Sequence, residues 1–271
     1  MSKNYITPAK LLSKLNEGSI ENLKIINIGF GDSAKKSFYD TAIPTANMIE
    51  LKEFTEMKPL AFTNPSKTHF NKMMKKLNIK ETDEVVVYNG ISAAKAWFIF
   101  RHYKFPNVKL LDGGLKGWTE LHYPLNKFIT PVDFSSSATD TFEAKTPDTT
   151  ELCHLDELLT KIDGSSQIID VRKREVFNSR EHNNKGHVPS SHNIYFGELV
   201  DSLGRLRRKE EILEITERLK LDPTKETITY CQGGVTACIA IAALEEAGFT
   251  KLRLYDGSWA EFSSTDKTKN L

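Results

Sequence analysis

The sequence predicts an α/β protein made of two similar domains, each a mainly parallel sheet with helices on both faces. Two observations support this prediction. Short apolar runs alternate with amphipathic stretches, a pattern typical of parallel strands joined by covering helices. The same motifs also occur twice in the same order, which indicates a tandem duplication.

The elements of the first half have counterparts in the second half. Thr7 and Pro8 are typical of a helix start, and the apolar run at 24–28 predicts the strand that follows this helix. The matching pairs of segments are 7–12 and 155–159, 24–28 and 167–172, 42–47 and 187–193, 84–90 and 227–233, and 108–114 and 251–258.

The repeat sets the expected domain boundaries. We expect an N-terminal domain over residues 1–128 and a C-terminal domain over residues 150–271. The stretch 129–149 between them is rich in Ser, Thr, Asp and Pro and has no helical period, so it predicts a linker.

The stretch that indicates a function is 227–237, which reads Thr-Ile-Thr-Tyr-Cys-Gln-Gly-Gly-Val-Thr-Ala. A β-type run ends in Cys231, two glycines follow, and a helical pattern then continues to Gly248. This order predicts a thiol at the start of a loop whose next backbone N–H groups have no partner within the helix. Because these amides and the positive helix end favour an anion, we expect Cys231 to ionise more easily than a free cysteine. The matching residue of the first half, Asn89, cannot act as a thiolate.

These motifs resemble those of the two-domain rhodanese-type sulfurtransferases, the family of thiosulfate and 3-mercaptopyruvate sulfurtransferases, from about Thr7 to Phe262. The segments that carry the resemblance are Cys-Gln-Gly-Gly-Val-Thr at 231–236, Gly-His-Val-Pro at 186–189, Asp-Val-Arg at 170–172 and Tyr-Asp-Gly-Ser-Trp at 255–259. The resemblance implies two rhodanese-like domains and a cysteine that takes a sulfane sulfur from a donor. The resulting persulfide then passes its sulfur to a thiophilic acceptor.

The expected site follows from the resemblance and from the loop. Cys231 is the expected nucleophile and sulfur carrier, and the loop amides can hold its anionic persulfide without a metal or a cofactor. The expected amide cradle consists of Gln232, Gly233, Gly234, Val235 and Thr236. We expect both glycines to supply backbone dihedrals that other residues resist. The resemblance makes Arg172 the candidate ligand of the donor anion, with a structural ion pair as the equal alternative. A second substrate arginine of many relatives would fall at Val176, and Arg174 or Arg180 could replace it.

The resemblance leaves the sulfur donor open. Relatives that favour thiosulfate often carry two basic residues after the cysteine, where this chain has Gln232 and Gly233. Relatives that favour 3-mercaptopyruvate often carry Gly-Ser there and a histidine in the first half, where this chain has Ala42. Thiosulfate is favoured by a small margin because this chain has Gly233 in place of the serine of the 3-mercaptopyruvate enzymes.

Two other functions compete with sulfur transfer. A phosphatase of the same fold needs an arginine six residues after its loop cysteine to clamp the phosphoryl oxygens, and this chain has Ala237 there. A non-catalytic binding module is the second alternative, since the first half has Asn89 in place of the cysteine.

The net charge and the cysteine count indicate which partners and which cellular compartment to expect. The net charge of +1 gives no bulk field that would attract nucleic acid or a membrane, and no apolar run is long enough to span a bilayer. Three cysteines are an odd and sparse set, unlike a disulfide framework, and favour a reducing cytoplasm. The expected partners are a small-molecule sulfur donor and a thiol or cyanide acceptor, and the expected state is a monomer or weak dimer.

Overall fold

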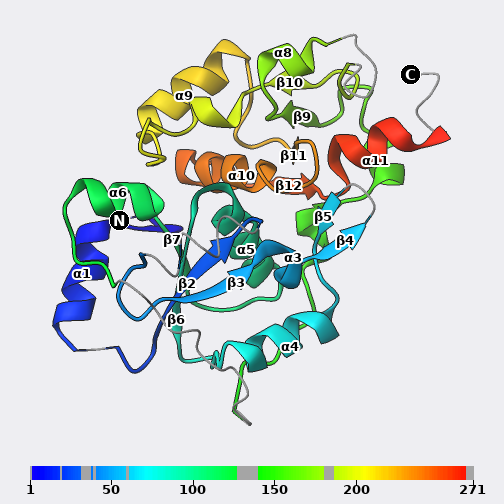
Figure 1. Cartoon of the computed structure of the whole chain (residues 1–271). Coiled ribbons are helices and arrows are strands. Elements are labelled where there is room, and N and C mark those ends of the chain that lie inside the picture. The colour runs from blue at the N-terminus through cyan, green and yellow to red at the C-terminus, as the bar shows by residue number, and fades with distance from the viewer. Residues whose placement is uncertain are drawn as a thin grey trace. The chain divides into compact units, whose positions relative to one another are not determined.

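The computed structural model describes residues 2–18, 20–31, 38, 41–58, 61–126, 140–179 and 186–266. Part of the expected linker, 129–139, therefore lies outside the described residues, and so does Arg180. The chain forms two compact units, each with its own sheet (Figure 1). Unit 1 comprises Met1–Glu56, Asn64–Asp148 and Ser202–Arg205, and unit 2 comprises Met57–Thr63, Thr149–Asp201 and Leu206–Leu271.

Unit 1 contains a five-stranded sheet with the strand order β1-β7-β6-β2-β3, and its strands pair in parallel. Its main elements are β1 (Tyr5–Ile6), α1 (Pro8–Asn16), β2 (Leu23–Gly29), β3 (Asn47–Glu50), α3 (Leu51–Phe54), α4 (Lys67–Lys76), β6 (Glu84–Tyr88), α5 (Gly90–His102), β7 (Val108–Leu111) and α6 (Gly114–Glu120). The predicted helix start is confirmed, because the Thr7 side chain accepts a hydrogen bond from Lys10 N at 3.3 Å and Pro8 opens α1.

Unit 2 repeats this topology with the strand order β10-β9-β11-β12-β8, again in parallel. Its elements are the hairpin strands β4 (Glu56–Lys58) and β5 (Ala61–Thr63), then η1 (Thr149–Glu151), β8 (Leu152–Cys153), α7 (Leu155–Leu159), β9 (Gln167–Asp170), α8 (Arg174–Phe177), β10 (His192–Asn193), η3 (Phe196–Glu198), α9 (Lys209–Arg218), β11 (Thr227–Tyr230), α10 (Ala237–Ala247), β12 (Leu252–Tyr255) and α11 (Ser258–Ser264). The predicted fold class, two α/β domains with mainly parallel sheets, is confirmed.

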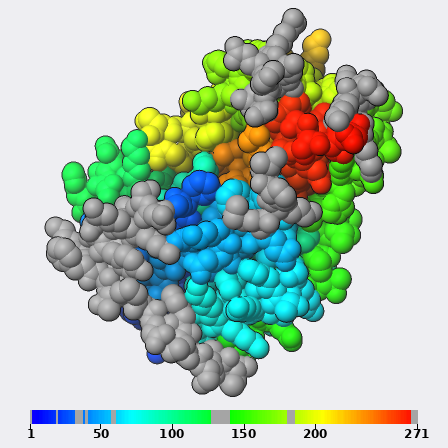
Figure 2. Space-filling view, turned by 45° about the vertical axis from the view of Figure 1, so that its right-hand side comes forward, coloured from blue at the N-terminus to red at the C-terminus, as the bar shows by residue number. Residues whose placement is uncertain are grey.

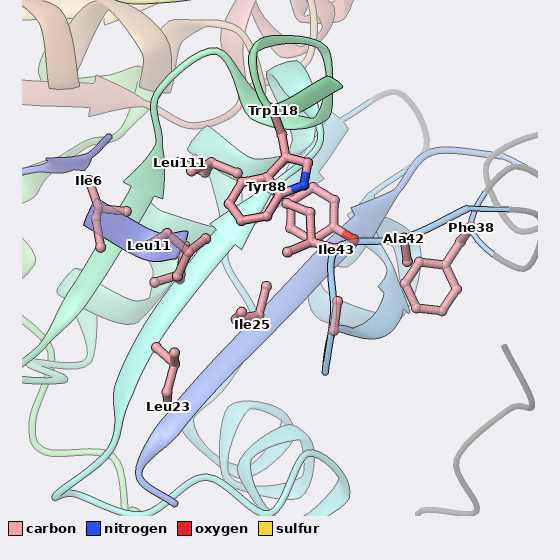
Figure 3. Packing of buried hydrophobic residues seen from close by; sticks show 12 residues of the cluster. Ile6, Leu11, Leu23, Ile25, Phe38, Ala42, Ile43, Tyr88, Leu111 and Trp118 are labelled. Atoms are coloured by element: carbon pink, nitrogen blue, oxygen red, sulfur yellow. The ribbon is translucent and has the colours of Figure 1, made fainter. Parts of the chain in front are cut away.

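Each unit has its own apolar core. In unit 1, Leu11 of α1 and Ile25 of β2 pack in the same cluster as Tyr88 and Trp118 (Figure 3). In unit 2, the cluster includes Ile168, Ile228, Tyr230 and Trp259, among others. Burying one large apolar side chain stabilises a fold by about 1.5–3 kcal/mol, so these clusters hold the helices on the sheets.

The centre of the second sheet positions the loop that the sequence singles out. All four residues of β11 are buried, and β11 lies between β9 and β12. Tyr230 is in register with Asp170, so the carboxyl ends of β11 and β9 lie side by side. Residues that follow these two strands therefore meet at one edge of the sheet, where ligands of such sheets bind.

Helix α11 is a short helix at the surface of the protein. The outer side of α11, drawn in red, lies at the surface in Figure 2. Ser263 and Ser264 of this helix are exposed. Within the described ranges, every helix is too short or too polar to cross a bilayer.

Candidate active site

Cys231 directly follows β11 and is a free cysteine that exposes 2% of its surface. Its backbone N–H donates to the hydroxyl of Ser258 at 3.2 Å, at the start of α11. The next helix, α10, begins only at Ala237 and is almost entirely apolar and buried. The thiol is therefore followed by a loop of five residues, 232–236, between a buried strand and a buried helix.

The loop is held through its carbonyl groups. Each of the six carbonyl oxygens of residues 231–236 accepts a hydrogen bond from the protein. The donors, in the order of the six acceptors, are Trp259 N (3.0 Å), Ala260 N (2.9 Å), Phe62 N (3.0 Å), Cys238 Sγ (3.6 Å), Cys238 N (3.2 Å) and Ile239 N (3.1 Å).

The amide N–H groups of the same loop have no hydrogen-bond acceptor among the described residues. In a trans peptide, the carbonyl of one residue and the N–H of the next point in opposite directions. Since the carbonyls turn toward the surrounding elements, the N–H groups of residues 232–236 turn away from those elements. Among the residues that the structure describes, none accepts a hydrogen bond from these N–H groups. Such a set of unpartnered donors after a thiol favours an anion at that point.

Gly234 of the glycine pair adopts a left-handed backbone conformation that favours glycine. Gly234 has a φ of +79°, and a Cβ added to it would lie 2.5 Å from the carbonyl oxygen of Asp256. The φ of Gly233 is not positive. The expectation of an unusual glycine backbone is therefore confirmed at Gly234.

Ser258 is a contact of the thiol that the sequence analysis did not single out. It is fully buried, has a φ of +53°, and its Oγ lies 4.0 Å from Cys231 Sγ and donates to Tyr255 O at 3.0 Å. The Tyr-Asp-Gly-Ser-Trp motif contains this serine. No spacing rule connects it with Cys231, however, because the contact depends on the pairing of β11 with β12.

Arg172 lies two residues beyond the end of β9 and is 5% exposed. Its Nη2 donates to Asp170 Oδ2 at 2.6 Å and to Gly186 O at 2.9 Å, and its Nε donates to the same carboxylate at 2.9 Å. The guanidinium carbon lies 4.5 Å from the centre of the Trp259 ring. Its Nη1 is buried and has no hydrogen-bond partner among the described residues. The structural ion pair is thus present, and one donor of the guanidinium remains for another acceptor.

The other candidate arginine and the position of the second substrate arginine lie on α8. Arg174 is the first residue of α8 and is exposed, whereas Val176 is half-buried. Arg180 lies outside the described residues.

The remaining cysteines differ from Cys231. Burial raises the pKa of Cys153 to about 12, although the charge of Arg253 acts against this shift, so Cys153 stays a thiol at neutral pH. Cys238 is fully buried in α10 and contacts the carbonyl of Gly234. Cys231 is therefore the only one of the three that combines a strand end with a loop of unpartnered amides.

The equivalent loop of unit 1 is built differently. Asn89 has a φ of +108°, and its Nδ2 donates to Asn27 Oδ1 and to Ile28 O, both at 3.2 Å. Helix α5 begins at Gly90, directly after Asn89. Unit 1 thus has neither the thiol nor the five-residue loop at this place.

The chain is similar in sequence to proteins of one family. The family model of the rhodanese-like domain matches residues 7–121 and 154–265. The 3-mercaptopyruvate sulfurtransferase of Rattus norvegicus is 29% identical over 247 residues, which are 86% of this chain and 80% of that protein. The thiosulfate sulfurtransferase of Gallus gallus is 29% identical over 239 residues, which are 84% of this chain and 81% of that protein.

Solved structures share the fold. The Tum1 protein of Saccharomyces cerevisiae has a TM-score of 0.84 at 21% identity, covering 97% of this chain and 96% of that one. SseA of Escherichia coli, described as a 3-mercaptopyruvate sulfotransferase, has a TM-score of 0.78 at 24% identity and covers 94% of this chain and 98% of that one. With the two sheets of matching topology and the two family matches, the chain belongs to the rhodanese-like domain family and carries this domain twice.

Proposed function

We propose that this protein is a sulfurtransferase that moves a sulfane sulfur from a donor to a thiophilic acceptor through a persulfide on Cys231. The observation that supports this most is the loop 231–236. Its carbonyl groups are all bonded to the protein, and no described residue accepts a hydrogen bond from the N–H groups of 232–236, which follow a strand-end thiol. Fixed amide donors of this kind stabilise a thiolate and a persulfide anion alike.

The transfer runs in two balanced steps. The Cys231 thiolate attacks the outer sulfur of thiosulfate, the sulfur–sulfur bond of the donor breaks, and sulfite leaves with the electron pair. In the second step, cyanide or a thiolate attacks the terminal sulfur of the persulfide. The new bond forms, the bond to Cys231 Sγ breaks, and the thiolate returns. Neither step requires a metal or an organic cofactor.

We assign the remaining groups to binding. Gln232, Gly233, Gly234, Val235 and Thr236 contribute the amide cradle. Arg172 is the proposed ligand of the donor anion through Nη1, the buried donor that its ion pair with Asp170 leaves over. A guanidinium that is already oriented by a carboxylate loses little freedom when it binds an anion.

The donor is either thiosulfate or 3-mercaptopyruvate. One relative named for each donor is 29% identical to this chain. Ala42, where the resemblance placed a histidine of the mercaptopyruvate enzymes, is fully buried in the core of unit 1. The ratio of kcat/KM for the two donors decides between them.

The proposed setting is the cytoplasm, because the mechanism requires Cys231 as a thiolate and not as half of a disulfide. All three cysteines are free in the structure. A phosphatase is disfavoured because Ala237 is fully buried and offers no charge to a phosphoryl group.

Intact-mass measurement tests the function. After incubation with thiosulfate or 3-mercaptopyruvate, we expect the wild-type protein to gain one sulfur atom and Cys231→Ser to gain none. Cys153→Ser is the control and should still gain the sulfur, because burial keeps Cys153 protonated. A gain in Cys231→Ser, or no gain in the wild type with either donor, would contradict the proposal.

A further inference from the structure

A short hairpin from the first half of the sequence belongs to unit 2. The segment Met57–Thr63 is assigned to this unit, and its strands β4 and β5 form a separate two-stranded sheet. Strand β5 contacts α11, the helix that also donates to the active-site loop (Figure 1). The backbone N–H of Phe62 donates to the carbonyl oxygen of Gly233 at 3.0 Å.

This hydrogen bond differs from the others that hold the loop. The carbonyls of residues 231 and 232 are bonded by the first turn of α11, and those of residues 234–236 by the first turn of α10. The carbonyl of Gly233 lies between these two groups. Its donor is the only one of the set that comes from before residue 149 in the sequence.

The Gly233–Gly234 peptide is also the one that can most easily turn over. A peptide flip changes ψ of the first residue and φ of the second, and two glycines oppose such a rotation less than any other pair. In the present orientation, the carbonyl faces Phe62 and the N–H of Gly234 points to the opposite side. A flipped peptide would direct its carbonyl oxygen to that side and repel a sulfur anion.

We propose that the backbone N–H of Phe62 is a positioning group of the persulfide site, which fixes the Gly233–Gly234 peptide with its N–H available to the sulfur. The inference rests on the proposed function of Cys231. It assigns to the first repeat a direct part in the chemistry of the second, through one main-chain hydrogen bond.

Packing of the hairpin does not depend on this hydrogen bond alone. Ala61 and Thr63 are buried at 4% and 5% exposure, whereas Phe62 between them is half-buried. Successive side chains of a strand point to opposite faces, so Ala61 and Thr63 dock the hairpin together. The N–H of Phe62 is bonded to the carbonyl oxygen of Gly233, which lies outside the hairpin.

Removal of this N–H tests the proposal. Phe62→Pro deletes this donor, because proline has no backbone N–H. Replacement of Phe62 by phenyllactic acid, which turns the amide into an ester, removes the same N–H and keeps the side chain. Suppression with phenylalanine at the same codon is the matched control, and Phe62→Ala reports the loss of the side chain.

Two readouts separate positioning from folding. In single-turnover experiments, we expect the proline and ester variants to form the Cys231 persulfide about 10- to 100-fold more slowly, somewhat less than the loss of an entire oxyanion-type donor. The pH profile of Cys231 alkylation by iodoacetamide should shift to higher pH in both variants, because the thiolate loses a donor. Phe62→Ala should keep the wild-type pH profile.

The outcomes are distinct. If the wild type gains no sulfur, the proposed function fails. If the wild type gains sulfur and the ester variant matches its rate and pH profile, the function stands and the positioning role of Phe62 is overturned. If Phe62→Pro does not fold, the ester variant alone decides.

Discussion

Any side chain at Gly234 would conflict both with the φ of this residue and with the neighbouring backbone of Asp256. Its φ of +79° is unfavourable for residues with a Cβ, and that Cβ would lie 2.5 Å from Asp256 O. We expect Gly234→Ala to lower the free energy of unfolding by about 1–3 kcal/mol and to abolish measurable sulfur transfer. Urea denaturation and the thiosulfate assay measure these effects. Gly233→Ala, at a φ that is not positive, should cost less than half of this stability, and equal losses would contradict the assignment.

A second residue-scale prediction concerns the hydroxyl of Ser258. Ser258→Ala leaves the buried N–H of Cys231 without its acceptor and removes the hydroxyl 4.0 Å from Sγ. An unsatisfied buried donor costs about 1–3 kcal/mol, so we expect a lower melting temperature together with slower persulfide formation.

The matched control for Ser258 lies at the other end of the same helix. Ser264 also donates to the carbonyl three residues before it, at 3.1 Å to Glu261 O, but it is exposed. Ser264→Ala should therefore change neither the melting temperature nor the rate of persulfide formation appreciably. The assignment would be wrong if the two serine variants behaved alike.

At the scale of elements, a cluster of charges joins β12, α7 and the start of β11. Nη1 of Arg253 in β12 contacts Oε1 of Glu157 in α7 and lies 3.0 Å from Oε1 of Glu226. The second carboxylate oxygen of Glu226, Oε2, lies 2.5 Å from Nζ of Lys161. Burial acts to raise the pKa of Glu226, but hydrogen bonds from Lys161, Ser166 and Arg253 outweigh it and lower the pKa to about 2.

The sign of the pH effect follows from this shift. A carboxyl group whose pKa is lower in the folded state stabilises the fold above its unfolded pKa, and this contribution is lost as the pH falls from about 5 to about 2. We expect Glu226→Gln to flatten the fall of the unfolding free energy in this window. Urea denaturation at several pH values gives the slopes. Identical slopes in wild type and variant would show that Glu226 has no lowered pKa.

The elements that the sequence predicts are those with a local signal. The apolar runs at 24–28 and 167–172 appear as β2 and β9, and Gly248 ends α10 in a left-handed conformation as a C-cap glycine does. The run from β11 through the glycines to α10 is likewise local, so the loop could be anticipated. An ion pair of Arg172 is one of the two expected alternatives, and Arg172 pairs with Asp170, the last residue of β9, from a position just beyond the strand.

The remaining features depend on tertiary structure. Strands β1, β8 and β10 have two residues each, too few to show an alternating pattern. Nothing in the sequence near Phe62 indicates that its hairpin joins unit 2 and bonds to Gly233. The positive φ of Ser258, a residue type that seldom adopts it, also has no local signal.

At the scale of the whole molecule, two copies of one topology differ in the loop that follows the central strand. The orders β1-β7-β6-β2-β3 and β8-β12-β11-β9-β10 correspond strand for strand. Unit 2 places five residues between Cys231 and α10, whereas unit 1 begins α5 directly after Asn89. The sheet therefore provides the same strand end in both units, and the loop that follows this strand end differs between them.

This difference predicts that a cysteine cannot restore the first site by itself. We expect Asn89→Cys in a Cys231→Ser background to gain no sulfur from thiosulfate. A side chain at φ +108° starts from a backbone unlike that of Cys231, and the amides of the first turn of α5 point along the helix axis instead of surrounding the thiol. Intact mass after incubation measures the gain. Asn89→Cys with Cys231 retained is the control, and it should gain one sulfur, on Cys231. A gain in the double variant would mean that a thiol at a strand end suffices and that the loop 232–236 is not the source of the reactivity.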